Sequence, residues 1–84
     1  MEEKLIGKIT HYFNKIQVAI IELTEEIKIG DKIHVKGHNT DFEQDITSMQ
    51  IDRVDVEKAK KGDAIGLKVD EKVREGDEVY LILP

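Results

Sequence analysis

The sequence repeats one short pattern three times, at Ile27-Lys28-Ile29-Gly30-Asp31-Lys32-Ile33, Ala59-Lys60-Lys61-Gly62-Asp63-Ala64-Ile65 and Val73-Arg74-Glu75-Gly76-Asp77-Glu78-Val79. Each copy reads apolar-x-x-Gly-Asp-x-apolar. Glycine permits the positive φ that ends a turn, and aspartate can accept backbone hydrogen bonds from the turn it follows. We therefore expect each copy to form a tight turn that leads into a strand. The other interpretation, three aspartates around a cation, is disfavoured because oxygen ligands must cluster and these lie at separate turns.

Strand signals dominate the rest of the chain. Runs of alternating apolar and polar residues are separated by short turns such as Asn14-Lys15 and the segment 37–41, which predicts two hairpins. The expected strands are 5–13, 16–23, 32–36, 42–51, 65–69 and 79–83. Only the segment 56–61 could hold a helical turn.

Two of these strands change the phase of their alternation. In the strand 16–23 the apolar positions move from Ile20 to Ile21, and in the strand 42–51 a similar change lies near Ser48. A β-bulge accommodates such a change and bends the strand around a corner. We therefore predict an all-β fold, a small closed antiparallel β-barrel of six or seven strands.

Length and composition agree with a single domain at residues 1–84. A chain of 84 residues holds one hydrophobic core, and the absence of cysteine excludes disulfides and thiolate metal sites. Glu2 and Glu3 stand where a signal peptide needs basic residues, and no apolar stretch is long enough for a membrane span. We expect a cytoplasmic protein that does not enter the membrane.

The repeat and the strands around it resemble the second domain of elongation factor Tu, the β-barrel of the translational GTPases. The resemblance runs from about Leu5 to Leu83 and is carried by four stretches, Ile6-Gly7-Lys8-Ile9, the repeat at 27–33, Ile46-Thr47-Ser48-Met49-Gln50 and 59–67. It implies a translation-protein barrel. The GTPase activity of that family lies in another domain, and this chain has no phosphate-binding loop, so we expect no nucleoside triphosphate site and no cofactor.

A second resemblance is to short stand-alone elongation-factor-like proteins and to the C-terminal barrel of peptidase family U32 proteins. It is carried by the run Thr10-His11-Tyr12-Phe13, the loop 37–44 and the segment Ser48-Met49-Gln50-Ile51. This resemblance implies a barrel that works together with a larger enzyme.

Two surface stretches are the best candidates for a binding site. His11, Tyr12 and Lys15 surround a hairpin tip, where an exposed aromatic ring beside a cation could stack on a base or fill a pocket of a partner. The elongation-factor resemblance points to the segment 49–53, with Gln50 and Arg53, because that segment holds the acylated end of transfer RNA in the family. With Arg53, the residues Lys58, Lys60 and Lys61 form the only basic cluster of the sequence.

No catalytic or metal-binding constellation is expected. His34 and His38 are four residues apart, but the first lies on a strand and the second in a turn, so they lack the helical geometry of a ligand pair. His11 has no recognisable nucleophile or orienting acid near it in the sequence.

The leading hypothesis is a non-catalytic module that binds RNA or a ribonucleoprotein through these two stretches. The alternative is a protein-interaction module that acts with a larger enzyme. The net charge of −5 favours the alternative, because RNA affinity comes largely from Lys and Arg that neutralise phosphates.

Overall fold

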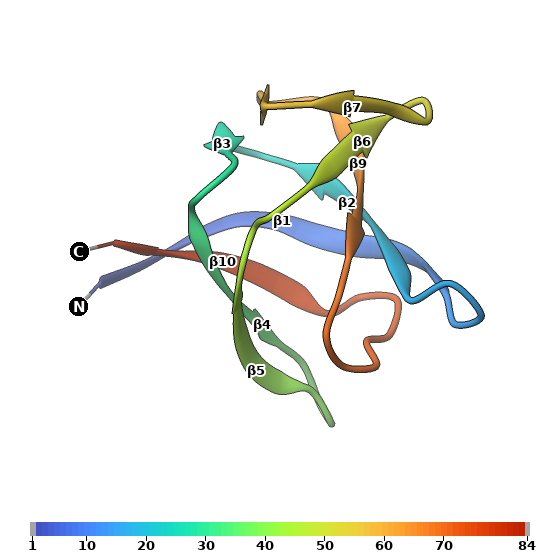
Figure 1. The fold of residues 1–84 in the computed structure, drawn as a ribbon. Helices are drawn as coiled ribbons and strands as arrows, with labels where there is room; N and C mark the ends of the chain where they lie inside the picture. Colours follow the sequence, from blue (N-terminus) through green and yellow to red (C-terminus); the bar gives the residue numbers. More distant parts are fainter. Residues whose placement is uncertain (1, 84) are drawn as a thin grey trace.

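The computed structural model describes residues 2–83, which form ten β-strands and no helix (Figure 1). The strands are β1 (Glu2–Phe13), β2 (Val18–Leu23), β3 (Ile27–Lys28), β4 (Lys32–Lys36), β5 (Asp41–Asp45), β6 (Met49–Ile51), β7 (Val54–Val56), β8 (Lys58–Ala59), β9 (Ala64–Lys68) and β10 (Glu78–Leu83). A helix able to cross a membrane is not found in this part of the chain.

The three Gly-Asp turns share one geometry, as the repeat predicts. Their glycines, Gly30, Gly62 and Gly76, have φ values of 97°, 94° and 92°. In each turn the aspartate N–H donates to the carbonyl of the residue three positions earlier. The aspartate carboxylate accepts the N–H of that same residue, at 2.9 to 3.0 Å. Each turn is therefore closed twice, once by the backbone and once by the side chain.

Each turn is also bound to one buried residue elsewhere in the chain. The three residues are Ile9, Leu23 and Ile46, and each uses both of its backbone groups. Ile46, for example, donates its N–H to the carbonyl of Asp31 and accepts the N–H of Gly30, at 2.8 and 2.9 Å. The turns thus fasten the start of β4, β9 and β10 to the core.

The antiparallel all-β prediction is confirmed, but no closed barrel is found among residues 2–83. Eight strands pair in the order β5-β4-β10-β1-β2-β9-β6-β7, and β3 pairs with β8 in a separate two-stranded sheet. The chain has ten strands instead of the predicted six or seven, because the expected strand 42–51 divides into β5 and β6 and because the short strands β3, β7 and β8 were not expected. At the division Ile46 bonds to the turn at Gly30-Asp31 instead of continuing a ladder.

The segment 56–61 is not helical, contrary to our expectation. It contains the end of β7 and the whole of β8. The apolar residues of this segment, Val56 and Ala59, pack on or in the core, and β8 pairs with β3 through Ile27 and Lys28. Tertiary pairing therefore overrides the weak helical preference of a Lys-rich stretch.

Of the two expected changes in the phase of apolar alternation, one is confirmed and the other is found on the neighbouring strand. Near Ser48 the change is confirmed, since Ile46 and Met49 are buried while the two residues between them are exposed. In β2, however, the pairing with β9 is regular from Val18 to Glu22. The irregularity lies across the ladder on β1, between Ile9 and His11. β2 therefore presents apolar side chains on both faces.

Replacing Asp77 by alanine should lower the free energy of unfolding by about 1–2 kcal/mol, because the Arg74 N–H loses its acceptor in a turn whose aspartate is only 6% exposed. Urea denaturation followed by circular dichroism measures this loss. Asp45→Ala is the matched control. It removes the same charge from an exposed strand position and should change the value by less than about 0.5 kcal/mol. Equal losses in both variants would contradict a role for the turn carboxylate.

Candidate functional site

The outer surface of the sheet carries a row of side chains that crosses five strands. The register pairs His11 with Ile20, Ile20 with Gly66, Gly66 with Gln50 and Gln50 with Asp55. The amide of Gln50 donates to Asp55 at 2.9 Å. Because neighbouring strands are about 4.8 Å apart, His11 and Gln50 lie about 14 Å apart on the same surface. Two of the candidate residues, His11 and Gln50, thus lie on either side of an apolar centre formed by Ile20 and Gly66.

This centre extends toward the β1–β2 turn. Phe13 and Ile16 are 46% and 60% exposed, and Val18 and Ile20 are half-buried beside them. Gly66 has no side chain to fill the space next to Val18 and Ile20, where a Cβ would make only ordinary contacts of 3.5 and 3.7 Å. We call the surface formed by Phe13, Ile16, Val18, Ile20 and Gly66 the hairpin face.

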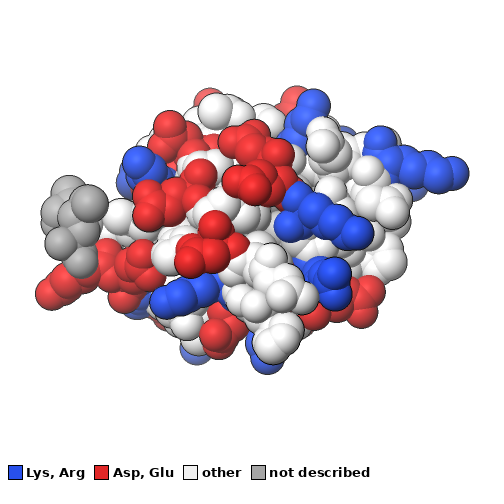
Figure 2. All heavy atoms as spheres, turned by 90° about the horizontal axis from the view of Figure 1, so that it is seen from below, with Lys and Arg blue, Asp and Glu red and all other residues white. Residues whose placement is uncertain are grey.

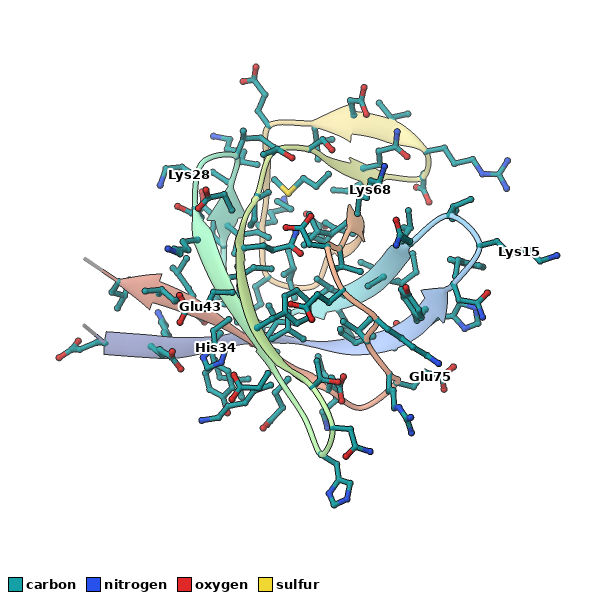
Figure 3. The ribbon with its side chains drawn as sticks, turned by 60° about the horizontal axis from the view of Figure 1, so that its bottom comes forward. Lys15, Lys28, His34, Glu43, Lys68 and Glu75 are labelled. Atoms are coloured by element: carbon teal, nitrogen blue, oxygen red, sulfur yellow. The ribbon has the colours of Figure 1, made fainter. Side chains whose placement is uncertain are left out.

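The residues predicted at the hairpin tip divide between the core and the surface. Tyr12 packs against the core, whereas Phe13 points outward with its ring 4.3 Å from that of His11 in an edge-to-face arrangement. His11 also pairs with Glu75 at 3.3 Å. Lys15 projects away from the tip (Figure 3). The exposed aromatic residue of this stretch is therefore Phe13, and Lys15 is the cation beside it.

Gln50 and Arg53 come to the same side of the molecule through a second hairpin. β6 and β7 are joined by Asp52 and Arg53, whose φ values of 52° and 67° fit a two-residue turn of type I′. The turns of β1–β2 and β6–β7 both project from the side opposite the chain ends (Figure 1). Arg53 and Lys15 therefore lie at two hairpin tips that flank the hairpin face.

The remaining candidate cations do not lie beside the hairpin face; they are Lys58, Lys60 and Lys61. They follow β7, whereas Arg53 precedes it, so they lie beyond the opposite end of that strand. Acidic groups surround them. Glu26 and Asp63 line a shallow hollow with Lys58 and Lys60, and the charge of Lys61 adds to the effect of the Lys4 hydrogen bond in lowering the pKa of Glu25. The predicted basic cluster is thus divided and partly neutralised.

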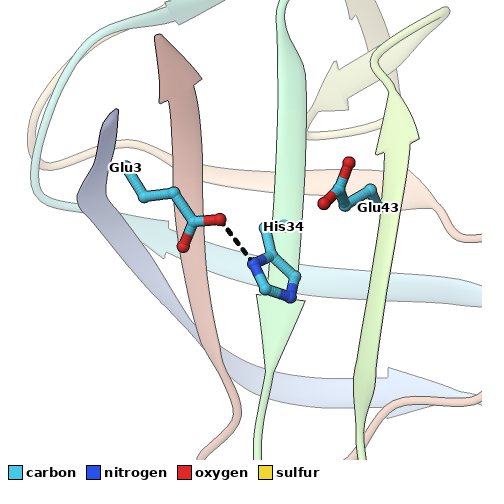
Figure 4. Close-up of side chains that lie close together, drawn as sticks. All are labelled: Glu3, His34 and Glu43. Carbon is cyan, nitrogen blue, oxygen red and sulfur yellow. Dashed lines mark hydrogen bonds and ion pairs between the residues drawn. The ribbon is translucent and has the colours of Figure 1, made fainter. Parts of the chain in front are cut away.

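A second group of polar side chains lies on the outer surface of β1, β4 and β5, and it was not expected from the sequence. The Nδ1 atom of His34 is 2.7 Å from a carboxylate oxygen of Glu3, and its Nε2 atom bonds to Asp41. Glu43 lies on the other side of the ring (Figure 4). The His34 side chain is only 12% exposed, so these carboxylates and the sheet shield it from most of the solvent.

Cross-strand pairing explains why this group could not be found by spacing along the chain. Glu3 and His34 are 31 residues apart, and β10 lies between their strands. Of the three acidic residues, Glu43 alone is a direct register partner of His34, whose partner on β10 is Tyr80. The signal available in the sequence was the alternation of β4, which places His34 between the buried residues Ile33 and Val35 and therefore on the outer surface.

Comparison with known proteins shows which proteins this chain resembles. No protein-family model matches the chain. It is 47% identical over 78 residues to an uncharacterised protease of Methanocaldococcus jannaschii, a match that covers 92% of this chain and 19% of the protease. It is also 36% identical over 81 residues to a collagenase of Porphyromonas gingivalis, covering 94% and 22% of the two chains. The chain therefore spans about a fifth of the length of these relatives.

A solved structure agrees in fold. The C-terminal domain of a U32 peptidase of Geobacillus thermoleovorans superposes with a TM-score of 0.89 at 14% sequence identity, over 95% of this chain and 93% of that domain. The chain resembles the C-terminal domain of U32 peptidases. Of the two resemblances drawn from the sequence, this one is supported by structure and by relatives, whereas the one to elongation factor Tu is not shown.

We expect the pKa of His34 to lie above its usual value, chiefly because of the hydrogen bond to Asp41, with Glu3 adding to the rise and burial opposing it. Because the pKa of His34 is higher in the folded than in the unfolded chain, protonated His34 stabilises the fold. This stabilisation is complete at pH values below the unfolded pKa of about 6.5, and it is lost as the pH rises through the folded pKa. Titration of the imidazole by NMR with EDTA present measures the shift. Asp41→Asn should lower this pKa more than Glu43→Gln. Equal effects would contradict a dominant hydrogen bond to Asp41.

Proposed function

We propose that this chain is a non-catalytic protein-interaction module that docks through its hairpin face onto a larger protein of the U32 peptidase type. The observation that carries the proposal is the apolar outer surface of a regularly paired sheet. Phe13 and Ile16 are more exposed than most apolar side chains of the molecule, and they adjoin Val18 and Ile20. Contiguous exposed apolar surface of this kind is typical of interaction sites.

The relatives indicate which partner the face would contact. About four fifths of the length of the matching protease and collagenase lies outside the segment that resembles this chain. A module of that kind needs a surface by which it packs on the rest of such a protein. An apolar centre with Lys15, Gln50 and Arg53 around it has the composition of an interface, with an aromatic residue inside and polar groups at the rim.

The absence of catalysis is also part of the proposal. Histidine is the side chain used most often as a general acid or base, and in a nucleophilic site it lies beside the hydroxyl or thiol that it activates. Among residues 2–83 the bonds of the histidines go to carboxylates, from His34 to Glu3 and Asp41 and from His11 to Glu75. We infer that the chemistry of the relatives resides outside the matching fifth of their length.

The RNA interpretation receives less support. A nucleic-acid surface needs a continuous basic stripe, because each neutralised phosphate adds to the affinity. The candidate cations lie at two separated places, Lys15 and Arg53 at the hairpin tips and Lys58, Lys60 and Lys61 beyond the other end of β7. The net charge of −5 acts in the same direction.

Phe13→Ala should weaken binding to the partner by about tenfold or more, because truncating an aromatic residue at the centre of an interface costs roughly 1–3 kcal/mol. The partner for the test is the Methanocaldococcus relative with its matching 78 residues removed. Isothermal titration calorimetry measures the affinity. Val54→Ser is the matched control. Val54 is 62% exposed, but it is next to Asp55 on β7, so its side chain points to the opposite face of the sheet from the surface that carries the hairpin face.

Three results would contradict this function. The first is no binding at partner concentrations of about 100 μM. The second is an equal loss of affinity in the Phe13→Ala and Val54→Ser variants. The third is retention of transfer or ribosomal RNA on a filter at low salt, lost as salt rises, which is the behaviour of phosphate contacts and would favour the RNA alternative.

A further inference from the structure

Three potential metal ligands converge on the outer surface of the half-sheet formed by β5, β4, β10 and β1. They are Glu3 from β1, His34 from β4 and Glu43 from β5, and one ligand atom of each lies within 4.8 Å of the other two. In Figure 4 the two carboxylates lie on either side of the imidazole ring. This surface is distinct from the hairpin face, which is built on β1, β2 and β9.

We propose that Glu3, His34 and Glu43 bind a divalent transition-metal ion. The orientation of the imidazole supports this assignment. The Nδ1 atom of His34 points to the Glu3 carboxylate, 2.7 Å away, and the Nε2 atom points to Asp41. Metal-binding histidines typically coordinate through one ring nitrogen while the other donates its hydrogen to a carboxylate that fixes the ring. Asp41 is already in place as that positioning residue.

Binding requires one exchange of a proton for the ion and small movements of side chains. The ion takes the place of the hydrogen between His34 Nδ1 and Glu3, and this proton leaves to solvent. The carboxylate of Glu43 turns toward the ion from its exposed position on the edge strand β5. Water completes the coordination on the open side. Nε2 keeps its hydrogen, which it donates to Asp41.

The charge of the group favours a cation. Three carboxylates, those of Glu3, Asp41 and Glu43, surround a single imidazole. Two cations compensate this charge in part: Lys32, whose ammonium is 3.9 Å from Glu43, and Lys36, whose charge contributes to lowering the pKa of Asp41. Acidic side chains also crowd the left half of the face seen in Figure 2, which views the molecule from the side of β4 and β5. A divalent ion would relieve this repulsion.

The donor set defines the class of ion. One imidazole nitrogen and two carboxylate oxygens suit Zn²⁺, Co²⁺, Mn²⁺ or Fe²⁺, whereas Mg²⁺ and Ca²⁺ prefer oxygen ligands alone. The ligands come from strands that are not all neighbours, since β10 lies between β1 and β4. A bound ion would therefore link the N-terminal part of β1 to β4 and β5, and it would stabilise the fold by an amount that grows with the logarithm of the free ion concentration.

Titration of the chelator-treated protein with Zn²⁺ in a calorimeter tests the proposal. We expect one ion per chain, with His34→Gln abolishing this binding and Glu43→Gln weakening it by about tenfold or more. Asp41→Asn should weaken it by a similar factor. Because Asp41 acts only through His34, ¹H–¹⁵N spectra of the imidazole provide its specific readout: in the native chain Zn²⁺ should move the Nδ1 signal and leave the hydrogen on Nε2.

His38→Gln and His11→Gln are the matched controls, since both histidines are exposed and lie elsewhere on the surface. Neither change should alter the stoichiometry or the affinity. The proposal is overturned if Zn²⁺ does not bind at millimolar concentration, if His34→Gln leaves the binding unchanged, or if a control variant loses it equally. Glu43→Gln changes only an exposed edge-strand residue, so its effect can be read even if the His34 variant folds poorly.

Discussion

The fold depends on one repeated interaction, the pair of backbone hydrogen bonds that joins each Gly-Asp turn to a buried residue. Ile9, Leu23 and Ile46 each donate to an aspartate carbonyl and accept from a glycine N–H. These residues lie in segments of the chain distant from the turns that they hold. A β-sheet of short strands buries little backbone by itself, so a turn that also satisfies an interior residue fixes both the turn and the path of the chain beside it.

The position of the hairpin face follows from this arrangement. The turn at Gly62-Asp63 holds Leu23 at the end of β2, and β9 begins directly after it. The pairing of β2 with β9 then runs without interruption, so Ala19 and Ile21 point to the core while Val18 and Ile20 point outward. A bulge between Ile20 and Ile21 would have turned Val18 and Ile20 to the same side as Ile21 and Leu23. Because the bulge is on β1 instead, an apolar surface remains on the outside.

The sequence was sufficient for the class of fold and for its turns, and insufficient for its closure and its sites. Glycine at positive φ followed by aspartate is a local signal, and the structure confirms all three copies. Strand pairing is not local. The sequence shows that β2 carries apolar residues in both phases, but either a bulge or an apolar outer face can explain that pattern. The choice depends on β1 and β9, which are distant in the chain.

The same limit applies to His34. Its place on an exposed strand face follows from alternation alone, but Glu3 reaches it across β10 and only the assembled sheet brings the two together.

The strand β1 connects the two candidate sites and also keeps them apart. It carries Glu3 near one end and Phe13 at the other, ten residues away, which corresponds to a separation on the order of 30 Å along an extended strand. Two register irregularities, near Gly7 and His11, bend the strand between them, so its first half pairs with β10 and its second half with β2. Groups separated by more than about 10 Å without shared contacts usually act additively. Binding at the proposed metal site is therefore expected to leave docking through the hairpin face unaltered, and docking is expected to leave the metal site unaltered.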